Sequence, residues 1–166
     1  MNPFLLWLES TALSTWVRES PSVFAFPAIL SCHTVGMGLA AGINASLALR
    51  ILGAAPGIPI HEMKRFFPVM WFGFWLNAIS GVVLLVAYPT KALTNPLFYF
   101  KLILVAVAVA LVMPIERSVF GEPGRDHDPA FGQVKKLAIA SLVCWAGVIV
   151  SGRLLAYTYT RLLQGF

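Results

Sequence analysis

SVFAFPAILSCHTVGMGLAAGINASLALRIL, residues 22–52, contains the longest run of the chain without a charged residue. A helix needs about 20 mainly apolar residues to cross the hydrocarbon core of a bilayer, so this stretch predicts a membrane-spanning helix. His33 lies near its middle and is the one histidine of the chain within an apolar run. An ionisable ring at that depth is costly, which makes His33 the first candidate for a functional residue.

The composition indicates an integral membrane protein. Hydrophobic residues make up 58% of the 166 residues and charged residues only 11%, whereas soluble domains are about 25% charged. The length predicts a single domain, residues 1–166. The formal charge of +5 is explained by basic residues that flank membrane spans, and no basic cluster with interleaved aromatics points to nucleic acid. Cys32 and Cys144 lie in apolar runs and are expected to be free thiols.

The remaining chain predicts three further spans and one surface helix. Residues 2–19 are amphipathic and too polar to span, so we expect them to form an interfacial helix on the membrane surface. Ser20 and Pro21 then resemble a helix cap followed by a first-turn proline. The expected spans are 22–52, 66–88, 97–118 and 137–159. Short connections imply antiparallel neighbours, so the predicted fold is all-α, a transmembrane four-helix bundle with an N-terminal amphipathic interfacial helix.

Two spans carry stripes of small and polar residues, which favour an inward orientation. Gly38 and Gly42 have the GxxxG spacing that permits close helix contact. The stripe of the first span is His33, Gly36, Met37, Ala40 and Asn44, and that of the second is Gly73, Asn77, Ser80 and Gly81. The second and fourth spans also end similarly, in SGVVLLVAYPTK (80–91) and SGRLLAYTYTR (151–161). This similarity suggests two helical hairpins related by an axis along the membrane normal.

His33 leaves three chemical interpretations open. It could ligate the iron of haem b, with Gly36 and Ala40 giving room for the flat macrocycle on the same face. It could bind a soft metal such as copper(I) together with Cys32 and Met37. It could also hydrogen-bond across helices or relay protons without any cofactor. Arg153, deep in the fourth span, could hold a haem propionate, a quinone carbonyl or a lipid phosphate, because its fork matches oxyanions.

A second axial ligand for a haem is not evident in the sequence. The other histidines, His61 and His127, lie in the connections at the membrane edge. Met37 is one turn from His33 on the same helix, so it cannot ligate the opposite face of the same iron. The iron would then be five-coordinate, or its second ligand would come from a histidine on a re-entrant loop, from Met70 or from a second subunit.

Three segments carry a resemblance to a known family. WLESTALSTWVRES, PAILSCHTVGMGLAAG and FFPVMWFGFWLNAISG together resemble an uncharacterised family of bacterial four-span inner-membrane proteins, which implies fold and membrane but no activity. HTVGMGLAAG more distantly resembles the histidine-bearing helices of copper-resistance D-like and cytochrome b561-like bundles. Those families would imply copper passage or haem-based electron transfer. This chain lacks the further transmembrane histidines that hold two haems in cytochrome b561, which leaves at most one.

Lysine and arginine counts predict the orientation. Seven such residues lie in or beside the first and third connections and four on the opposite side, where Lys101 is close enough to the helix end to snorkel. This favours a multi-pass protein of the bacterial inner membrane with both termini periplasmic. The leading hypothesis is a membrane subunit that binds one haem b, passes electrons within a larger complex and is not an enzyme on its own. The alternatives are a structural or assembly subunit and copper handling, and the expected partners are the lipid bilayer, other membrane subunits or further copies of the chain, with quinone as a possible ligand.

Overall fold

The computed structural model describes residues 3–121 and 131–163, and in these ranges the regular structure is helical. Four helices are long and apolar enough to cross a membrane. They are α3 (Phe26–Ile51), α4 (Phe67–Ala87), α6 (Pro96–Phe120) and α7 (Phe131–Leu163). The short elements are α1 (Pro3–Glu9), α2 (Ala12–Glu19), the 3-10 helix η1 (Ile60–Phe66) and α5 (Pro89–Leu93). The predicted all-α bundle of four spans is therefore confirmed.

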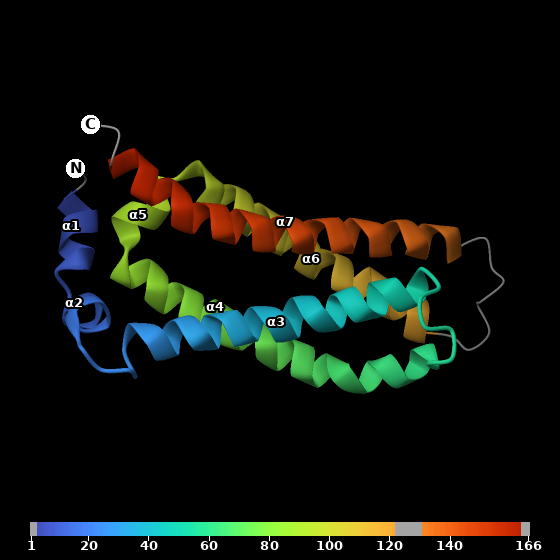
Figure 1. Cartoon of the computed structure of the whole chain (residues 1–166). Coiled ribbons are helices and arrows are strands. Elements are labelled where there is room, and N and C mark those ends of the chain that lie inside the picture. The colour runs from blue at the N-terminus through green and yellow to red at the C-terminus, as the bar shows by residue number, and fades with distance from the viewer. Residues whose placement is uncertain (1–2, 122–130, 164–166) are drawn as a thin grey trace.

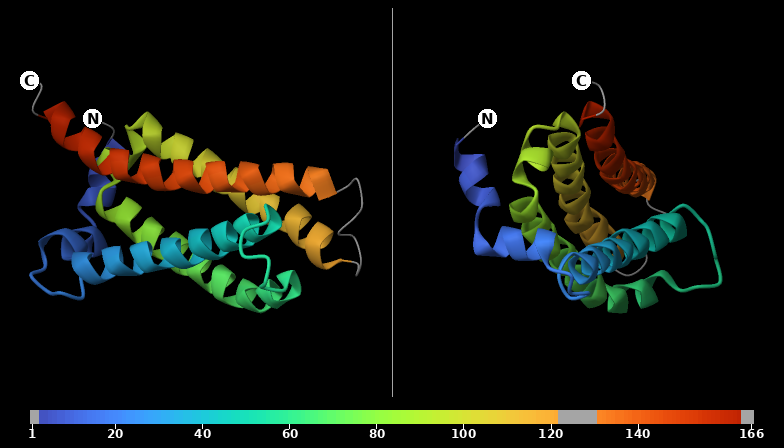
Figure 2. Two further views of the ribbon diagram at one scale, coloured as in Figure 1. Left: turned by 45° about the vertical axis from the view of Figure 1, so that its right-hand side comes forward. Right: turned by 60° about the vertical axis from the view of Figure 1, so that its left-hand side comes forward.

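The four long helices form two antiparallel hairpins (Figure 1). α3 packs along α4, α6 packs along α7, and the main contact between the hairpins is that of α3 with α7. α5 connects the two hairpins at the end of the bundle where α1 and α2 lie, here called the α2 end (Figures 1 and 2). The opposite end carries η1 and is called the η1 end.

The N-terminal segment forms two short helices instead of the single helix expected for residues 2–19. The hydroxyl of Ser10 donates to the carbonyl of Trp7 at 2.7 Å, and that of Thr11 donates to the carbonyl of Leu8 at 2.8 Å. Such local side-chain bonds compete with helix continuation, and Thr11 instead caps α2 by accepting from the backbone N–H of Ser14. α1 and α2 therefore lie across the α2 end of the bundle (Figure 1).

The start of the first span also differs from the expectation. Ser20 and Pro21 precede the helix, and α3 begins at Phe26 with Pro27 in its first turn. The third span begins as its sequence indicates, because Asn95 caps α6 by accepting from the backbone N–H of Leu97 at 3.0 Å.

Two clusters of buried apolar residues join the hairpins. The η1-end cluster consists of Leu47, Ala48, Ile51, Phe67, Met70, Val112, Ile115, Val134 and Ala138. The central cluster consists of Ala40, Ala41, Ala108, Cys144, Trp145 and Val148. Towards the α2 end, His33 precedes Ala40 by seven residues and Lys101 precedes Ala108 by seven. Seven residues of helix span about 10 Å, so both basic side chains start from the same level beyond the central cluster.

Candidate functional site

His33 is bonded to α4. Its ring Nδ1 lies 3.0 Å from the backbone oxygen of Asn77 and 3.2 Å from the Ser80 hydroxyl. The Asn77 side-chain amide donates in return to the backbone oxygen of His33 at 2.7 Å. Gly81 permits this approach, because a Cβ there would lie 3.1 Å from Cε1 of the ring. The polar residues of the two predicted stripes thus meet each other at this level.

The bonding pattern assigns the tautomer of His33. A backbone oxygen can only accept, so at 3.0 Å from Asn77 the ring Nδ1 must carry hydrogen and donate it. The Nε2 of the neutral ring then keeps its lone pair, and no described residue forms a hydrogen bond with it. A histidine that ligates a metal is held in this way, with its other ring N–H on a backbone carbonyl. A neutral imidazole held through Nδ1 can chemically coordinate a metal ion or accept a proton at Nε2.

Lys101 is the second basic group at this level, and sequence reasoning assigned it only to the membrane surface. It is half-buried on α6, and its charge acts electrostatically on His33. Its Nζ lies 3.7 Å from the position that a Cβ on Gly152 of α7 would occupy. The signal that pointed to it was the Ser-Gly pair shared by the second and fourth spans, which we interpreted only as a repeat.

The structure places the small residues of the first span in helix packing. A Cβ on Gly36 would lie 2.6 Å from the backbone N of Asn77 and 2.7 Å from the backbone O of Gly73, so α3 and α4 touch there. Ala40 is buried in the central cluster. α4 therefore fills the side of α3 on which Gly36 was expected to give room for a macrocycle.

The predicted GxxxG contact of α3 is not formed. A Cβ on Gly38 or on Gly42 would have no neighbour within 4 Å, in contrast to Gly36. The predicted inward stripe that contains Gly36, and not the Gly38–Gly42 pair, faces α4, where Gly36 lies opposite Gly73. The close helix contact itself, predicted from the small residues, does occur.

The other candidate side chains lie apart from the His33 ring nitrogens. Cys32 is exposed and Cys144 is buried in the central cluster, and both are free thiols. Met37 packs against that same cluster. Arg153 is exposed on α7, next to Gly152 in the sequence. His61 is exposed in η1, at the opposite end of the bundle, and His127 lies outside the described residues.

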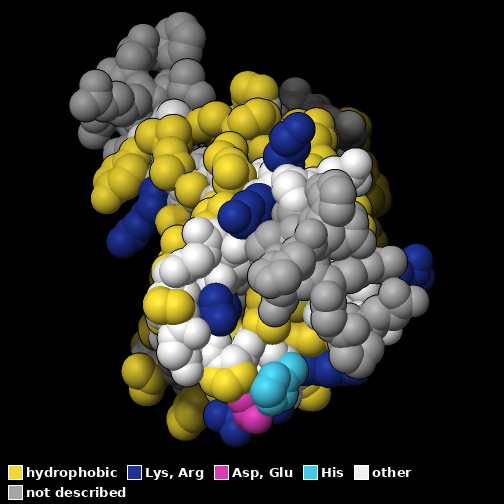
Figure 3. Space-filling model, turned by 90° about the vertical axis from the view of Figure 1, so that its right-hand side faces the viewer, with side chains coloured by type: hydrophobic (Ala, Val, Ile, Leu, Met, Phe, Trp, Pro, Cys, Tyr) yellow, Lys and Arg dark blue, Asp and Glu magenta, His cyan; other side chains and the backbone are white. Residues whose placement is uncertain are grey.

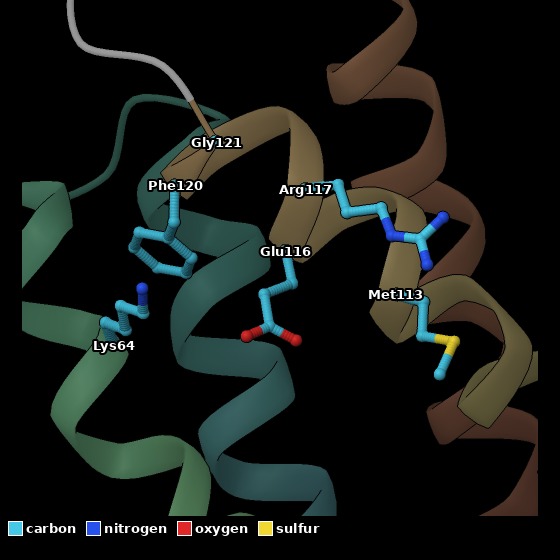
Figure 4. Close-up of a pocket in the computed structure, with 6 residues that line it drawn as sticks. All are labelled: Lys64, Met113, Glu116, Arg117, Phe120 and Gly121. Atoms are coloured by element: carbon cyan, nitrogen blue, oxygen red, sulfur yellow. The ribbon is translucent and has the colours of Figure 1, made fainter.

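A separate pocket of about 310 Å³ opens at the η1 end. Lys64 of η1 faces Glu116 and Phe120 of α6, while the Arg117 side chain points away from Lys64 and Met113 precedes Glu116 on the same helix (Figure 4). None of the site residues predicted from the sequence lines this pocket. It is also far from His33, which lies near the other end of α3.

Fold and site together define a multi-pass membrane protein of helical hairpins with an oriented histidine inside the membrane. No family model matches the chain, and no solved structure matches it. The chain is similar to the Na(+)/H(+) antiporter NhaB of Pseudomonas aeruginosa (strain UCBPP-PA14), at 26% identity over 78% of this chain and 30% of that protein. The chain thus spans less than a third of the length of that relative.

Proposed function

We propose that this membrane protein binds one haem b through Nε2 of His33 and passes electrons within a larger membrane assembly. The observation that carries the proposal is the hydrogen bond from Nδ1 to the Asn77 carbonyl, which leaves Nε2 as the free ligand atom. Haem b bound there would supply one-electron redox chemistry. Asn77 and Ser80 would fix the ring plane, and burial within the spans would exclude water from the ligand atom.

Because α4 packs against α3 at Gly36, a haem on His33 would have to lie on the side of the ring away from α4. The polar contacts of Nδ1 occupy the α4 side, and the two apolar clusters that join the hairpins lie nearer the η1 end. A flat ligand of His33 would therefore lie between the hairpins at the α2 end. Since His61 is at the other end, any further protein ligand to the iron would come from a partner subunit or a second copy of the chain.

An absorption spectrum of the detergent-purified chain tests this function. We expect a Soret band in the unaltered protein, its loss in His33→Ala, and its retention in the matched variant His61→Ala. A Soret band that survives His33→Ala would remove His33 as the ligand. If the unaltered chain, purified from cells supplied with haem precursor, shows no Soret band, haem binding is rejected and a cofactor-free assembly subunit becomes the better account.

Proton-coupled cation transfer is a second candidate, favoured by the similarity to a Na(+)/H(+) antiporter. A free Nε2 on His33 can accept a proton within the membrane. Sodium, a hard cation, would need several oxygen ligands, yet Glu116 is the one acidic side chain in α3, α4, α6 and α7. Proteoliposomes with a trapped pH-sensitive dye distinguish the two functions: sodium-driven proton movement that His33→Ala abolishes would favour this candidate over haem.

Copper handling through Cys32, His33 and Met37 has less support in the geometry. Cys32 is exposed, whereas Met37 packs into the central cluster. Among the described residues, no group of three or more His, Cys, Asp or Glu side chains is placed to hold a metal ion. Copper above background in the purified protein, lost in Cys32→Ser, would be needed to restore it.

A further inference from the structure

The two hairpins place a basic side chain on a glycine in the same way. His33 of α3 lies over Gly81 of α4, with Cε1 3.1 Å from the position of a Cβ on that glycine. Lys101 of α6 lies over Gly152 of α7, with Nζ 3.7 Å from the corresponding position. Each glycine follows a serine in the repeated Ser-Gly pair of residues 80–81 and 151–152. Lys101 is therefore the counterpart of His33 in the second hairpin.

Lys101 has no counter-charge among the described residues. Its ammonium forms no described hydrogen bond or ion pair, although the side chain is half-buried inside a membrane span. Glu116, the one carboxylate of the described spans, is 15 residues further along the same helix, or about 22 Å away. A charge within a span is costly without a partner, so the residue either snorkels or binds an anion that the described part of the chain does not provide.

The relative depths of the two residues favour the anion. His33 lies seven residues into α3 and Lys101 five residues into α6, and both helices start at the α2 end. Lys101 therefore lies at about the level of His33 and, counted from the two helix starts, about 3 Å nearer that membrane surface. A haem in a membrane protein carries its charge on two propionates, so a haem on His33 with its carboxylates towards the α2 end would bring them to the level of Lys101.

We propose that Lys101, seated on Gly152, is the anion-recognising half of the His33 site and binds a propionate carboxylate of the haem. This rests on the proposed function, because it needs a haem on His33. It also replaces the earlier expectation for Arg153, whose side chain is exposed on α7. Lys101 donates N–H to the carboxylate and compensates its charge, and no bond is made or broken.

The experiment is a binding cycle with haem b and its dimethyl ester, which lacks both carboxylate charges. Apo-protein in nanodiscs of zwitterionic lipid is titrated with each, and the Soret band reports the dissociation constant. We expect Lys101→Gln to raise the dissociation constant of haem b about ten- to hundredfold and to leave that of the ester nearly unchanged. Lys101→Arg should keep the preference for haem b, and Lys91→Gln, at the same end of the bundle, should change neither affinity.

Each outcome decides the question. A preference for haem b over the ester that Lys101→Gln leaves intact, with the Soret band present, overturns the Lys101 assignment and leaves His33 as ligand. If Arg153→Gln removes the preference for haem b over the ester and Lys101→Gln does not, Arg153 is the residue that binds the propionate. An effect of Lys101→Gln that is equal for haem b and the ester would show a packing role. An effect that appears only in nanodiscs with anionic lipid would show that Lys101 binds a lipid phosphate. Both results overturn the assignment of Lys101 to the propionate. Failure of the unaltered chain to bind either haem rejects the proposed function itself.

Discussion

At the scale of single residues, the glycines of α3 differ in what they contact. Gly36→Ala would place a Cβ 2.6 Å from backbone N of Asn77, and backbone cannot move aside as a flexible side chain can. We expect the substitution to lower the free energy of unfolding by about 1–3 kcal/mol. Gly38→Ala, with no neighbour within 4 Å, should be neutral or slightly stabilising. Unfolding in mixed SDS micelles, followed by tryptophan fluorescence, measures both, and equal effects would contradict the packing described.

Gly81 controls the position of the His33 ring. In Gly81→Ala the new Cβ would lie 3.1 Å from Cε1 and 3.4 Å from Nδ1, so the ring must shift by a few tenths of an ångström. Because that shift disturbs the bond from Nδ1 to Asn77, we expect haem affinity to fall severalfold and the Soret maximum to move. Gly42→Ala, in open space on the same helix as His33, is the control. An unchanged spectrum and affinity in Gly81→Ala would mean that the ring orientation is set elsewhere.

At the scale of helices, α1 and α2 are held to the turn between α4 and α5. The fully buried Ser14 hydroxyl donates to the carbonyl of Ala87 at 3.2 Å, and the Glu9 carboxylate accepts from the backbone N–H of Thr90 at 3.3 Å. We expect Ser14→Ala to cost about 0.5–1.5 kcal/mol and to speed amide exchange throughout α1 and α2. Ser46→Ala, whose exposed hydroxyl bonds within its own helix, should leave that exchange unchanged. Exchange measured by mass spectrometry in nanodiscs shows which result holds.

The sequence predicts these helices far better than it predicts their contacts. The four spans can be predicted from hydropathy alone. Inside lipid no water hydrogen-bonds to the backbone, so a long apolar segment must form a helix that satisfies its own N–H and C=O groups. The depth of His33 follows from counting residues along one helix. Its partners Asn77 and Ser80 lie 44 and 47 residues further on, so their identity depends on the rotation and register of α3 against α4. The break between α1 and α2 at Ser10 and Thr11 could not be predicted either, because the amphipathic pattern continues across these residues.

At the scale of the whole molecule, the two hairpins have similar helix packing but carry different basic side chains at corresponding positions. Each hairpin seats one basic side chain on the glycine of a Ser-Gly pair, yet one side chain is an imidazole and the other an ammonium. The repeat suggested the hairpins, and the structure adds that α3 and α7 join them. In the site proposed between the hairpins, His33 would supply a ligand atom on one wall and Lys101 a positive charge on the other. That asymmetry orients any ligand whose charge lies at one edge.

The charge distribution of the molecule predicts its orientation in the membrane. The η1 end is bordered by lysine and arginine side chains (Figure 3), from Arg50, Lys64, Arg65, Arg117, Lys135 and Lys136. The α2 end carries Arg18 and Lys91 outside its spans. Basic residues remain on the cytoplasmic side, so the η1 end should face the cytoplasm and α1 the periplasm.

Single cysteines in a Cys32→Ser, Cys144→Ser background test this orientation. Both sites are exposed: Lys64→Cys reports on η1 and Ser10→Cys on the turn after α1. A membrane-impermeant maleimide added to intact spheroplasts should label Ser10→Cys and spare Lys64→Cys until the membrane is opened. The reverse pattern would place His33 nearer the cytoplasmic surface, and the proposed haem would then exchange electrons with a cytoplasmic partner. Partial labelling of both single-cysteine variants in intact spheroplasts would instead indicate dual insertion and would contradict a single orientation.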